Sequence, residues 1–308
     1  MRYFPLFLDL INKPVLVVGG GEVASRKVEA LLKAGADVTI VSPTLVDFLS
    51  KLASEHQLRW VQRFYSSDIV TKSFVQVWAT TDNPELNHQV YKDAKELGIL
   101  VNVVDDKPYC DFITPSMINR GRIQIAISSG GASPVLIRNI REKLESILPQ
   151  NMGLMADFAN SKRNSIKEAL PSVDLRRKFW EQFFSNPEVE NARDNRELEA
   201  IYQATMATPL DEKGSCTWVH VGKDVEMLPI KAVRYMQQAE LALYSTRCEA
   251  NVLELIRRDA EREAFSSAAE LSDMLAKAKA KAEKLRICVF IPQGTSEFVL
   301  LQGQDLVI

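Results

Sequence analysis

Residues 15–24 read VLVVGGGEVA, and this stretch decides the fold of the first part of the chain. Its apolar residues predict a strand, and its three glycines predict a turn. The residues that follow, through Leu32, have the spacing of an amphipathic helix. A second apolar run, Val38–Val41, predicts another strand. The pattern therefore predicts a strand, a helix and a second strand parallel to the first.

The glycine turn fits the pattern G-x-G-x-x-G/A, which places a dinucleotide at the start of a helix. Gly19 permits the tight turn, Gly21 lets a pyrophosphate approach the backbone, and Ala24 lets the helix pack close to the strand. The alternative is a strand-to-helix turn that binds no ligand. The strand before the turn and the helix after it favour nucleotide binding.

The second strand ends at Val41 and is followed by Ser42, Pro43 and Thr44, where an acidic residue normally binds the ribose. Neither an acid nor an arginine stands there, so these residues do not select between NAD and NADP. We expect backbone and hydroxyl groups to make the ribose contact instead. The predicted cofactor-binding residues are Gly19, Gly21, Glu22, Val23, Ala24, Pro43 and Thr44.

Later apolar runs continue the alternation of strands and helices. Val75–Ala79 and Ile99–Val104 predict two more strands, and the stretch from Pro84 to Leu97 between them predicts a helix. An α/β fold follows, with a Rossmann-type doubly wound parallel sheet over residues 1–113.

Beyond residue 113 the pattern changes. Ile123–Ile127 predicts a strand, and the stretch from Pro134 to Leu148 predicts a helix after a serine- and glycine-rich turn, within a small segment of residues 114–150. Residues 151–215 predict a helical domain of short helices, broken at Pro171 and Pro187, which ends in a linker from Met206 to Ser215.

Composition excludes several classes of protein. Lys and Arg total 38 against 40 Asp and Glu, a net charge of −2, which gives no overall attraction to nucleic acid or to an anionic membrane. The four cysteines lack the spacing of a disulfide framework or a zinc site, which indicates a cytoplasmic protein with reduced thiols. The apolar stretch Met1–Leu10 is short and charged, so we expect neither a signal peptide nor a membrane span.

Several blocks of sequence resemble the N-terminal module of siroheme synthases, in the same order along the chain. They are Phe4–Phe7 with Val17–Lys27, Ala79–Asp82 with Asn87, Asn102–Asp105, and Ser128–Pro134 followed by Arg141–Glu145. The resemblance covers about residues 1–215, and ordered blocks are more specific than one glycine motif. It implies a precorrin-2 dehydrogenase that forms sirohydrochlorin with NAD, and a ferrochelatase that inserts ferrous iron to give siroheme. It also implies a homodimer formed through residues 114–150.

Asp105 stands at the catalytic aspartate position of that family. It also follows an apolar strand directly, at the edge where open α/β sheets bind ligands. Its carboxylate is suited to accept a proton during dehydrogenation and to hold the metal transiently during iron insertion. For its neighbour Asp106 we favour a solvated loop charge.

Precorrin-2 carries eight carboxylates, so its site should be cationic. Residues 118–178 contain eleven Lys and Arg against five Asp and Glu, although any single one of these charges is more simply explained by a solvated helix face. The serine-rich turn could present hydroxyl and N–H groups to an anion, or it could simply cap the helix at Pro134. The predicted substrate-binding residues are Ser128, Ser129, Arg120, Arg122, Arg138 and Arg141, and Lys143 is a further candidate in the same basic stretch. The resemblance makes Ser129 a candidate for phosphorylation, which would repel this substrate.

The end of the chain, residues 216–308, resembles the opening of a uroporphyrinogen-III methyltransferase domain. The resemblance lies in Val219–Gly222, Lys231–Ala232, Gln238–Glu240 and Leu255–Ala260. The loop Gly222–Glu226 lacks the glycines and prolines that would hold S-adenosylmethionine, and 92 residues after Cys216 are too few for that domain. We therefore expect a degenerate remnant without methyltransferase activity. Within it, Ala264–Leu285 predicts a solvated amphipathic helix, and Thr217–Val221, Ile287–Phe290 and Phe298–Leu301 predict strands.

Two other functions remain open. The first is a non-catalytic NAD-sensing or regulatory protein, which the presence of Asp105 and of the basic stretch disfavours. The second is an ordinary hydroxy-acid dehydrogenase, which needs a catalytic histidine. His56, His88 and His220 are isolated in the sequence, so surface or structural roles are expected for all three.

Overall fold

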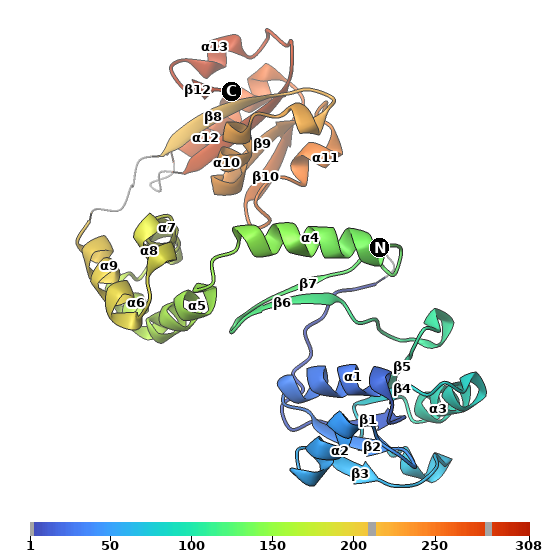
Figure 1. Cartoon of the computed structure of the whole chain (residues 1–308). Helices are drawn as coiled ribbons and strands as arrows, with labels where there is room; N and C mark the ends of the chain where they lie inside the picture. Colours follow the sequence, from blue (N-terminus) through green and yellow to red (C-terminus); the bar gives the residue numbers. More distant parts are fainter. Residues whose placement is uncertain (1–2, 209–213, 281–284) are drawn as a thin grey trace. The chain divides into compact units, whose positions relative to one another are not determined.

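The computed structural model describes residues 3–208, 214–280 and 285–308 (Figure 1). The chain forms two compact units, Met1–Asn160 and Ser161–Ile308. Each unit contains one five-stranded sheet in which all strand pairs are parallel. None of the described helices is both long and apolar enough to cross a membrane.

The sheet of the first unit has the strand order β3-β2-β1-β4-β5, so the order reverses beside β1. Its strands are β1 (Pro14–Val18), β2 (Asp37–Val41), β3 (Arg59–Val61), β4 (Gln76–Ala79) and β5 (Leu100–Val103). Its helices are α1 (Glu22–Lys33), α2 (Asp47–Ser54) and α3 (Pro84–Glu96), with short 3-10 helices η1 (Ser67–Ile69) and η2 (Lys107–Tyr109). The predicted doubly wound parallel sheet is confirmed, and β3 and α2 are additions to it.

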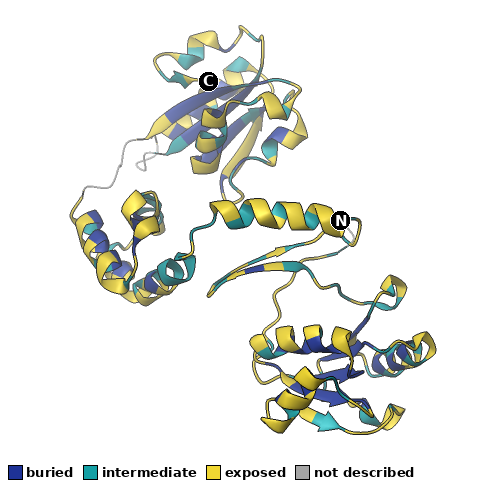
Figure 2. Cartoon of the chain, in the orientation of Figure 1, coloured by how far each residue is buried: buried dark blue, intermediate teal, exposed yellow. Residues whose placement is uncertain are grey.

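This sheet is buried on both faces, which explains why its strands are continuous apolar runs. Val15 and Val17 belong to the core beneath α1 and α2, whereas Leu16 and Val18 belong to the core beneath α3. Figure 2 shows these strands as buried, in contrast to the exposed outer faces of the helices.

The rest of the first unit is much more exposed. An antiparallel hairpin of β6 (Ser116–Arg120) and β7 (Ile123–Ile127) is followed by α4 (Pro134–Ile147). The strand β7 and the helix α4 agree with the prediction, whereas β6 was not predicted. None of the residues of α4 is buried, and Figure 2 shows most of the hairpin and of α4 as exposed or partly exposed.

The helical part of the chain has the predicted breaks. The helices are α5 (Met152–Ser161), α6 (Arg163–Ala169), α7 (Val173–Phe184), α8 (Pro187–Asn191) and α9 (Asn195–Ala207). Phe179, Phe183 and Tyr202 form its aromatic core. The predicted linker began at Met206, but α9 continues to Ala207 because Tyr202 and Thr205 still pack inward, and residues 209–213 of that linker lie outside the described part.

The second sheet has the strand order β10-β9-β11-β8-β12. Its strands are β8 (Ser215–Val221), β9 (Leu241–Ser245), β10 (Glu261–Phe265), β11 (Arg286–Pro292) and β12 (Leu306–Val307). Its helices are α10 (Ile230–Gln238), α11 (Ala250–Leu253), α12 (Ala268–Ala280) and α13 (Val299–Gln302), with the 3-10 helix η3 (Val225–Met227).

Of two predictions for this region, one has a different starting residue and the other was wrong. The amphipathic helix predicted over Ala264–Leu285 is present, with Leu271 and Leu275 on its buried face, but it begins only at Ala268 because Ala264 and Phe265 belong to β10. Residues 281–284 of that prediction lie outside the described part. The strand predicted at Phe298–Leu301 is a helical turn, since a short apolar run does not distinguish the two structures.

Candidate active site at the carboxyl edge of the first sheet

The glycine turn after β1 is shaped by its neighbours. Gly19 has a φ of +117°, and a Cβ atom on it would lie 2.7 Å from the Thr80 hydroxyl, which donates to the Val18 carbonyl at 2.8 Å. A Cβ atom on Gly20 would lie 2.3 Å from the Thr44 carbonyl oxygen. Only glycine therefore fits at these two positions.

The third glycine of the turn lies in open space instead. A Cβ atom on Gly21 would meet nothing within 4 Å, and Gly21 is the N-cap of α1 without a side-chain cap. The N–H groups of Glu22, Val23 and Ala24 stand at the positive end of the helix dipole, where a phosphate binds well. The space in front of this helix is therefore available to an anion.

The two residues predicted to contact the ribose lie beside this turn. Pro43 and Thr44 are exposed, and the Ser42 hydroxyl donates to the Thr44 carbonyl at 2.7 Å. The Trp60 ring nitrogen in turn donates to the Ser42 carbonyl at 2.9 Å. The loop after β2 is thus held in place next to the glycine turn.

Asp105 lies in the turn that follows β5, at the same edge of the sheet as the glycine turn. Since β4 pairs with both β1 and β5, the carboxyl ends of the three strands are neighbours. Asp105 is exposed and has a φ of +58°. Aspartate is one of the few residue types that adopt this left-handed conformation, and such strain is frequent at functional sites.

The loop that starts at Asp105 is tied back to β5. The Asn102 amide donates to the Phe112 carbonyl at 2.8 Å, and the Asp111 carboxylate accepts from the Val101 N–H at 3.0 Å. Asn87 supports the neighbouring turn after β4, because its side chain accepts from the Thr81 hydroxyl at 2.7 Å and donates to the Thr81 carbonyl at 2.9 Å. These two asparagines therefore stabilise loops at the sheet edge.

Asp106 is not the solvated charge that was predicted. Its carboxylate lies 2.7 Å from Nε2 of His88 on α3, and both side chains are only 32% exposed. The sequence interpretation missed this pair, because the two residues lie 18 positions apart and no metal or triad spacing connects them.

Lys27 brings a positive charge to the same loop. Its ammonium group lies 5.4 Å from the centre of the Trp78 ring and donates to the Thr114 hydroxyl at 3.2 Å. Burial lowers the pKa of Lys27, and the negative charge of Asp105 opposes that shift. The sequence signal was present in the Arg26-Lys27 pair, but no role was assigned to it.

The serine-rich turn after β7 is also joined to this loop. Lys107, two residues after Asp105, donates to the Gly131 carbonyl at 3.0 Å. Within the turn, the Ser128 hydroxyl accepts from the Gly130 N–H at 3.0 Å and the Ser129 hydroxyl accepts from the Ser133 N–H at 3.1 Å. Both hydroxyls thus stabilise the turn and can still donate to a ligand.

Three of the predicted substrate-binding arginines have carboxylate partners in the first unit. Arg120 pairs with Glu145 on α4, whose pKa that contact lowers, and Arg141 lies 3.5 Å from the same carboxylate. Arg122 pairs with Asp157. Arg138 is exposed on α4. Part of the positive charge that was expected to bind the substrate is therefore already paired with carboxylates of the chain itself.

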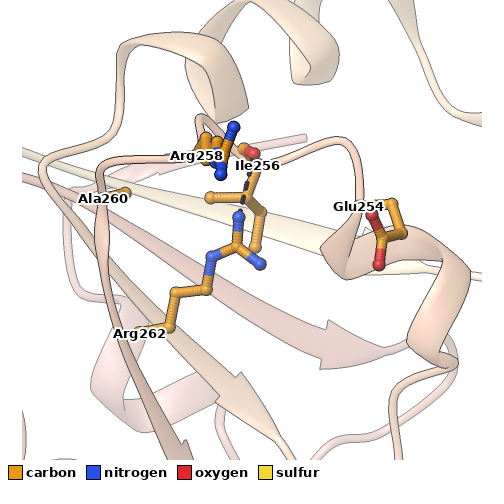
Figure 3. Close-up of a pocket in the computed structure, with 5 residues that line it drawn as sticks. All are labelled: Glu254, Ile256, Arg258, Ala260 and Arg262. Atoms are coloured by element: carbon orange, nitrogen blue, oxygen red, sulfur yellow. Dashed lines mark hydrogen bonds between the residues drawn. The ribbon is translucent and has the colours of Figure 1, made fainter. Parts of the chain in front are cut away.

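The second sheet offers a different kind of site. A cavity of about 610 Å³ is lined by Glu254, Ile256, Arg258, Ala260 and Arg262. In Figure 3 the Arg262 guanidinium points back to the segment before β10, where it donates to the Ile256 carbonyl at 3.2 Å. Within the described ranges, no group of three or more His, Cys, Asp or Glu residues is arranged to hold a metal ion.

Three family models match consecutive stretches of the chain. They are described as "Putative NAD(P)-binding" over residues 6–116, "Sirohaem biosynthesis protein central" over 120–147 and "Sirohaem synthase dimerisation region" over 151–205.

Curated relatives agree with these models. The chain is 43% identical to the siroheme synthase of Actinobacillus pleuropneumoniae serotype 3 over 85% of its own length and 54% of the relative. It is 38% identical to siroheme synthase 1 of Pectobacterium atrosepticum over 99% of its own length and 64% of the relative. The chain thus spans between 54% and 64% of the length of these two relatives.

A solved structure with similar architecture is described as "SirC, precorrin-2 dehydrogenase". The two chains share 25% sequence identity with a TM-score of 0.52, over 66% of this chain and 100% of the other. Together with the matched regions, which follow one another in the order NAD(P)-binding, central and dimerisation, this shows that the chain carries the N-terminal module of siroheme synthases.

Proposed function

We propose that this protein is a precorrin-2 dehydrogenase that uses NAD and forms sirohydrochlorin. The observation that carries the proposal is the position of Asp105, an exposed carboxylate at the same sheet edge as an open, glycine-lined helix N-terminus. The relationship to siroheme synthases and to a protein named as a precorrin-2 dehydrogenase supports the choice of substrate.

The residues of the first sheet fit a dinucleotide. The open space at Gly21 is a cradle that a side chain would fill, and the first N–H groups of α1 would hold the pyrophosphate. Pro43 and Thr44 would contact the ribose from the loop after β2. When bound, the nicotinamide ring accepts a hydride from the substrate.

Asp105 would take the proton that leaves precorrin-2 together with that hydride, so that two hydrogen nuclei and two electrons are removed in all. Ser128, Ser129 and Arg138 would bind substrate carboxylates. Arg120, Arg122 and Arg141 would do so only by sharing or exchanging their present carboxylate partners. Phosphorylation of Ser129 would add negative charge there and weaken substrate binding.

The deciding experiment is incubation of the purified protein with precorrin-2 and NAD, followed by absorption spectroscopy. We expect the spectrum of sirohydrochlorin and an equal amount of NADH. A protein that binds NAD but leaves the precorrin-2 spectrum unchanged would instead be the NAD-sensing or regulatory protein. Replacing NAD with NADP in the same assay determines the cofactor preference.

Iron insertion is a second proposed reaction, with ferrous iron and sirohydrochlorin as its substrates. It is favoured by the exposed Asp105 carboxylate, which can hold a hard cation briefly or accept the pyrrole protons that the metal displaces. Addition of ferrous iron to sirohydrochlorin and protein should accelerate siroheme formation above the rate without protein. An unchanged rate would contradict this reaction and leave the dehydrogenase proposal intact.

We also propose that the protein acts as a homodimer. Phe4, Leu6 and Phe7 are exposed, as are Val135 and Leu136 on α4, and a two-stranded hairpin is marginal without further packing. A second copy would cover these apolar groups. The match to a dimerisation region lies elsewhere in the chain, over residues 151–205, and supports a homodimer separately. Light scattering should give twice the chain mass, and Leu136→Glu should lower that mass at micromolar concentration. A monomeric parent protein would refute this assembly.

The remaining assignments concern the organisation of the chain. We propose four regions: residues 1–113 for NAD binding, 114–150 for dimerisation, 151–215 as a helical domain that includes the matched dimerisation region 151–205, and 216–308 as a remnant without methyltransferase activity. An assay with S-adenosylmethionine and uroporphyrinogen III tests the last point, and any methylated product would contradict it. The four cysteines are free, which suits a cytoplasmic location.

A further inference from the structure

His88 and Asp106 form a contact that the proposed reaction does not use directly. His88 projects from α3, and its Nε2 atom lies 2.7 Å from the Asp106 carboxylate. The imidazole ring also stacks on Tyr109, with ring centres 3.9 Å apart and planes 21° from parallel. The histidine is therefore held from two sides.

Asp106 is central to the turn that contains Asp105. Its N–H donates to the Val103 carbonyl at 3.3 Å, and its own carbonyl accepts from the Tyr109 N–H at 3.1 Å and from the Cys110 thiol at 3.3 Å. The hydrogen bond from His88 adds a tie between this turn and a separate helix. Displacement of Asp106 would therefore move Asp105, the next residue in the chain.

The conformation of Asp105 makes that tie important. A φ of +58° is unfavourable for a non-glycine residue, and it persists only where the surrounding structure holds it. Proton transfer also depends strongly on position, because a misplacement of about 1 Å can slow a reaction roughly a hundredfold.

We propose that His88 is a positioning residue for Asp105: by holding Asp106 against α3, it fixes the left-handed turn that carries the Asp105 carboxylate. This inference rests on the proposed dehydrogenase function. His88 itself touches no reacting atom in this scheme. It acts through the hydrogen bond to Asp106.

Two substitutions separate the hydrogen bond from the stacking. His88→Phe keeps an aromatic ring against Tyr109 but removes the donor, whereas His88→Gln keeps a nitrogen donor at a similar reach and removes the ring. We expect kcat to fall about tenfold in the Phe variant and to stay within about threefold of the parent value in the Gln variant, because the lost bond involves a charged acceptor. KM for NAD should not change in either variant.

A second measurement needs no catalysis. The Cys110 thiol donates to the carbonyls of Val103 and Asp106, at 3.1 Å and 3.3 Å, and burial raises its pKa. A looser turn would expose this thiol, so its alkylation rate should rise several-fold in His88→Phe and stay near the parent rate in His88→Gln. Peptide mapping by mass spectrometry follows Cys110 separately, with Cys248 in the second unit as the internal control.

The outcomes distinguish the two proposals. If the parent enzyme oxidises precorrin-2 and His88→Phe matches it in kcat and in Cys110 alkylation, the positioning role is wrong and the dehydrogenase function stands. A loss in the Gln variant beside parent-like values in the Phe variant would also overturn it, because that result would assign the effect to the ring and not to the hydrogen bond. If the parent protein is inactive, the proposed function fails, and the alkylation rates alone decide whether His88 holds the turn. Thermal unfolding of all three proteins excludes a general loss of structure.

Discussion

The two parallel sheets of this chain share an architecture but differ at their carboxyl edges. In the first sheet, β1 leads through three glycines into α1, whose N-terminus faces open space at Gly21. In the second sheet, β8 is followed by η3, and the Asp224 side chain accepts from the Glu226 N–H at 3.0 Å. The donors that could bind a phosphate are therefore open in one sheet and already capped in the other.

The charged side chains at the two carboxyl edges also differ in whether they already have a partner. Asp105 is exposed after β5, whereas Arg247 after β9 pairs with Glu297 after β11. Two sheets of one fold class thus offer a ligand very different groups. Binding depends on the loops after the strands, and the sheet itself supplies only their positions.

The largest expected effect is on catalysis at the first edge. Asp105→Asn keeps the size of the side chain but removes the proton acceptor, so kcat should fall by a factor of about 10² to 10⁴ while NAD affinity stays the same. Steady-state kinetics with precorrin-2 and a separate NAD titration measure both quantities.

The matched control is Asp224→Asn, at the corresponding edge of the second sheet, which should leave kcat unchanged. If Asp105→Asn kept full activity, the carboxylate would have no catalytic role. The exposed acid at the first edge would then not distinguish the two sheets in their chemistry.

Parts of this sheet edge could be predicted from the sequence. The first sheet follows from long apolar runs, and Asp105 follows from its place directly after one of them. The strand β3 has only three residues, and β6 reads Ser-Met-Ile-Asn-Arg, so neither gives a clear periodic signal.

Contacts between distant elements could not be predicted in the same way. The pairing of Arg120 with Glu145 depends on how α4 packs on the hairpin, and the pairing of His88 with Asp106 depends on how α3 lies against the loop after β5. Composition indicates a cationic region, but only the fold determines which of its charges already have partners.

The next largest effect concerns the amino edge of the second sheet, where charges stabilise the fold. Glu240, before β9, accepts from the Arg286 N–H at 2.6 Å and pairs with Arg177 on α7; the Glu181 carboxylate binds Arg286 at 2.7 Å. The Glu240 side chain is 7% exposed. Glu240→Gln should therefore lower the free energy of unfolding by about 3 kcal/mol, since it removes the most buried carboxylate charge of this network while the two guanidinium groups stay in place. Urea denaturation measures this value.

The pH dependence of this network has a definite sign. Burial alone would raise the pKa of Glu240, but the hydrogen bonds from Arg286 and Arg177 outweigh it and the pKa is lowered. Its stabilising contribution is thus present above the ordinary carboxyl pKa of 4.5 and is lost as the pH falls below that value.

The control for Glu240→Gln is Glu297→Gln, in the exposed pair with Arg247, which should lower the free energy of unfolding by less than about 1 kcal/mol. Equal losses in the two variants would contradict the burial argument.

A smaller effect is expected from the glycines that follow the first strand of each sheet. In Gly20→Ala the new methyl group would lie 2.3 Å from the Thr44 carbonyl, so the backbone must move, at a cost of about 1–3 kcal/mol in stability. In Gly222→Ala it would lie 3.1 Å from the tip of the flexible Gln293 side chain, and the cost should stay below about 0.5 kcal/mol. Thermal unfolding of the two variants measures the difference in stability. A larger loss of stability in Gly222→Ala than in Gly20→Ala would contradict this prediction.

The smallest effect on the fold, and the most direct test of the binding site, comes from Gly21. Gly21→Ala meets no neighbouring atom, and its φ of −89° suits alanine, so stability should change by less than about 0.5 kcal/mol. The added methyl group would nevertheless occupy the approach to the first N–H groups of α1, and the Kd for NAD should rise about tenfold. Calorimetric titration with NAD beside a thermal unfolding curve separates the two quantities. Unchanged NAD affinity would show that the open space at Gly21 is not the phosphate site, and the difference between the two sheet edges would then have to lie in their charges alone.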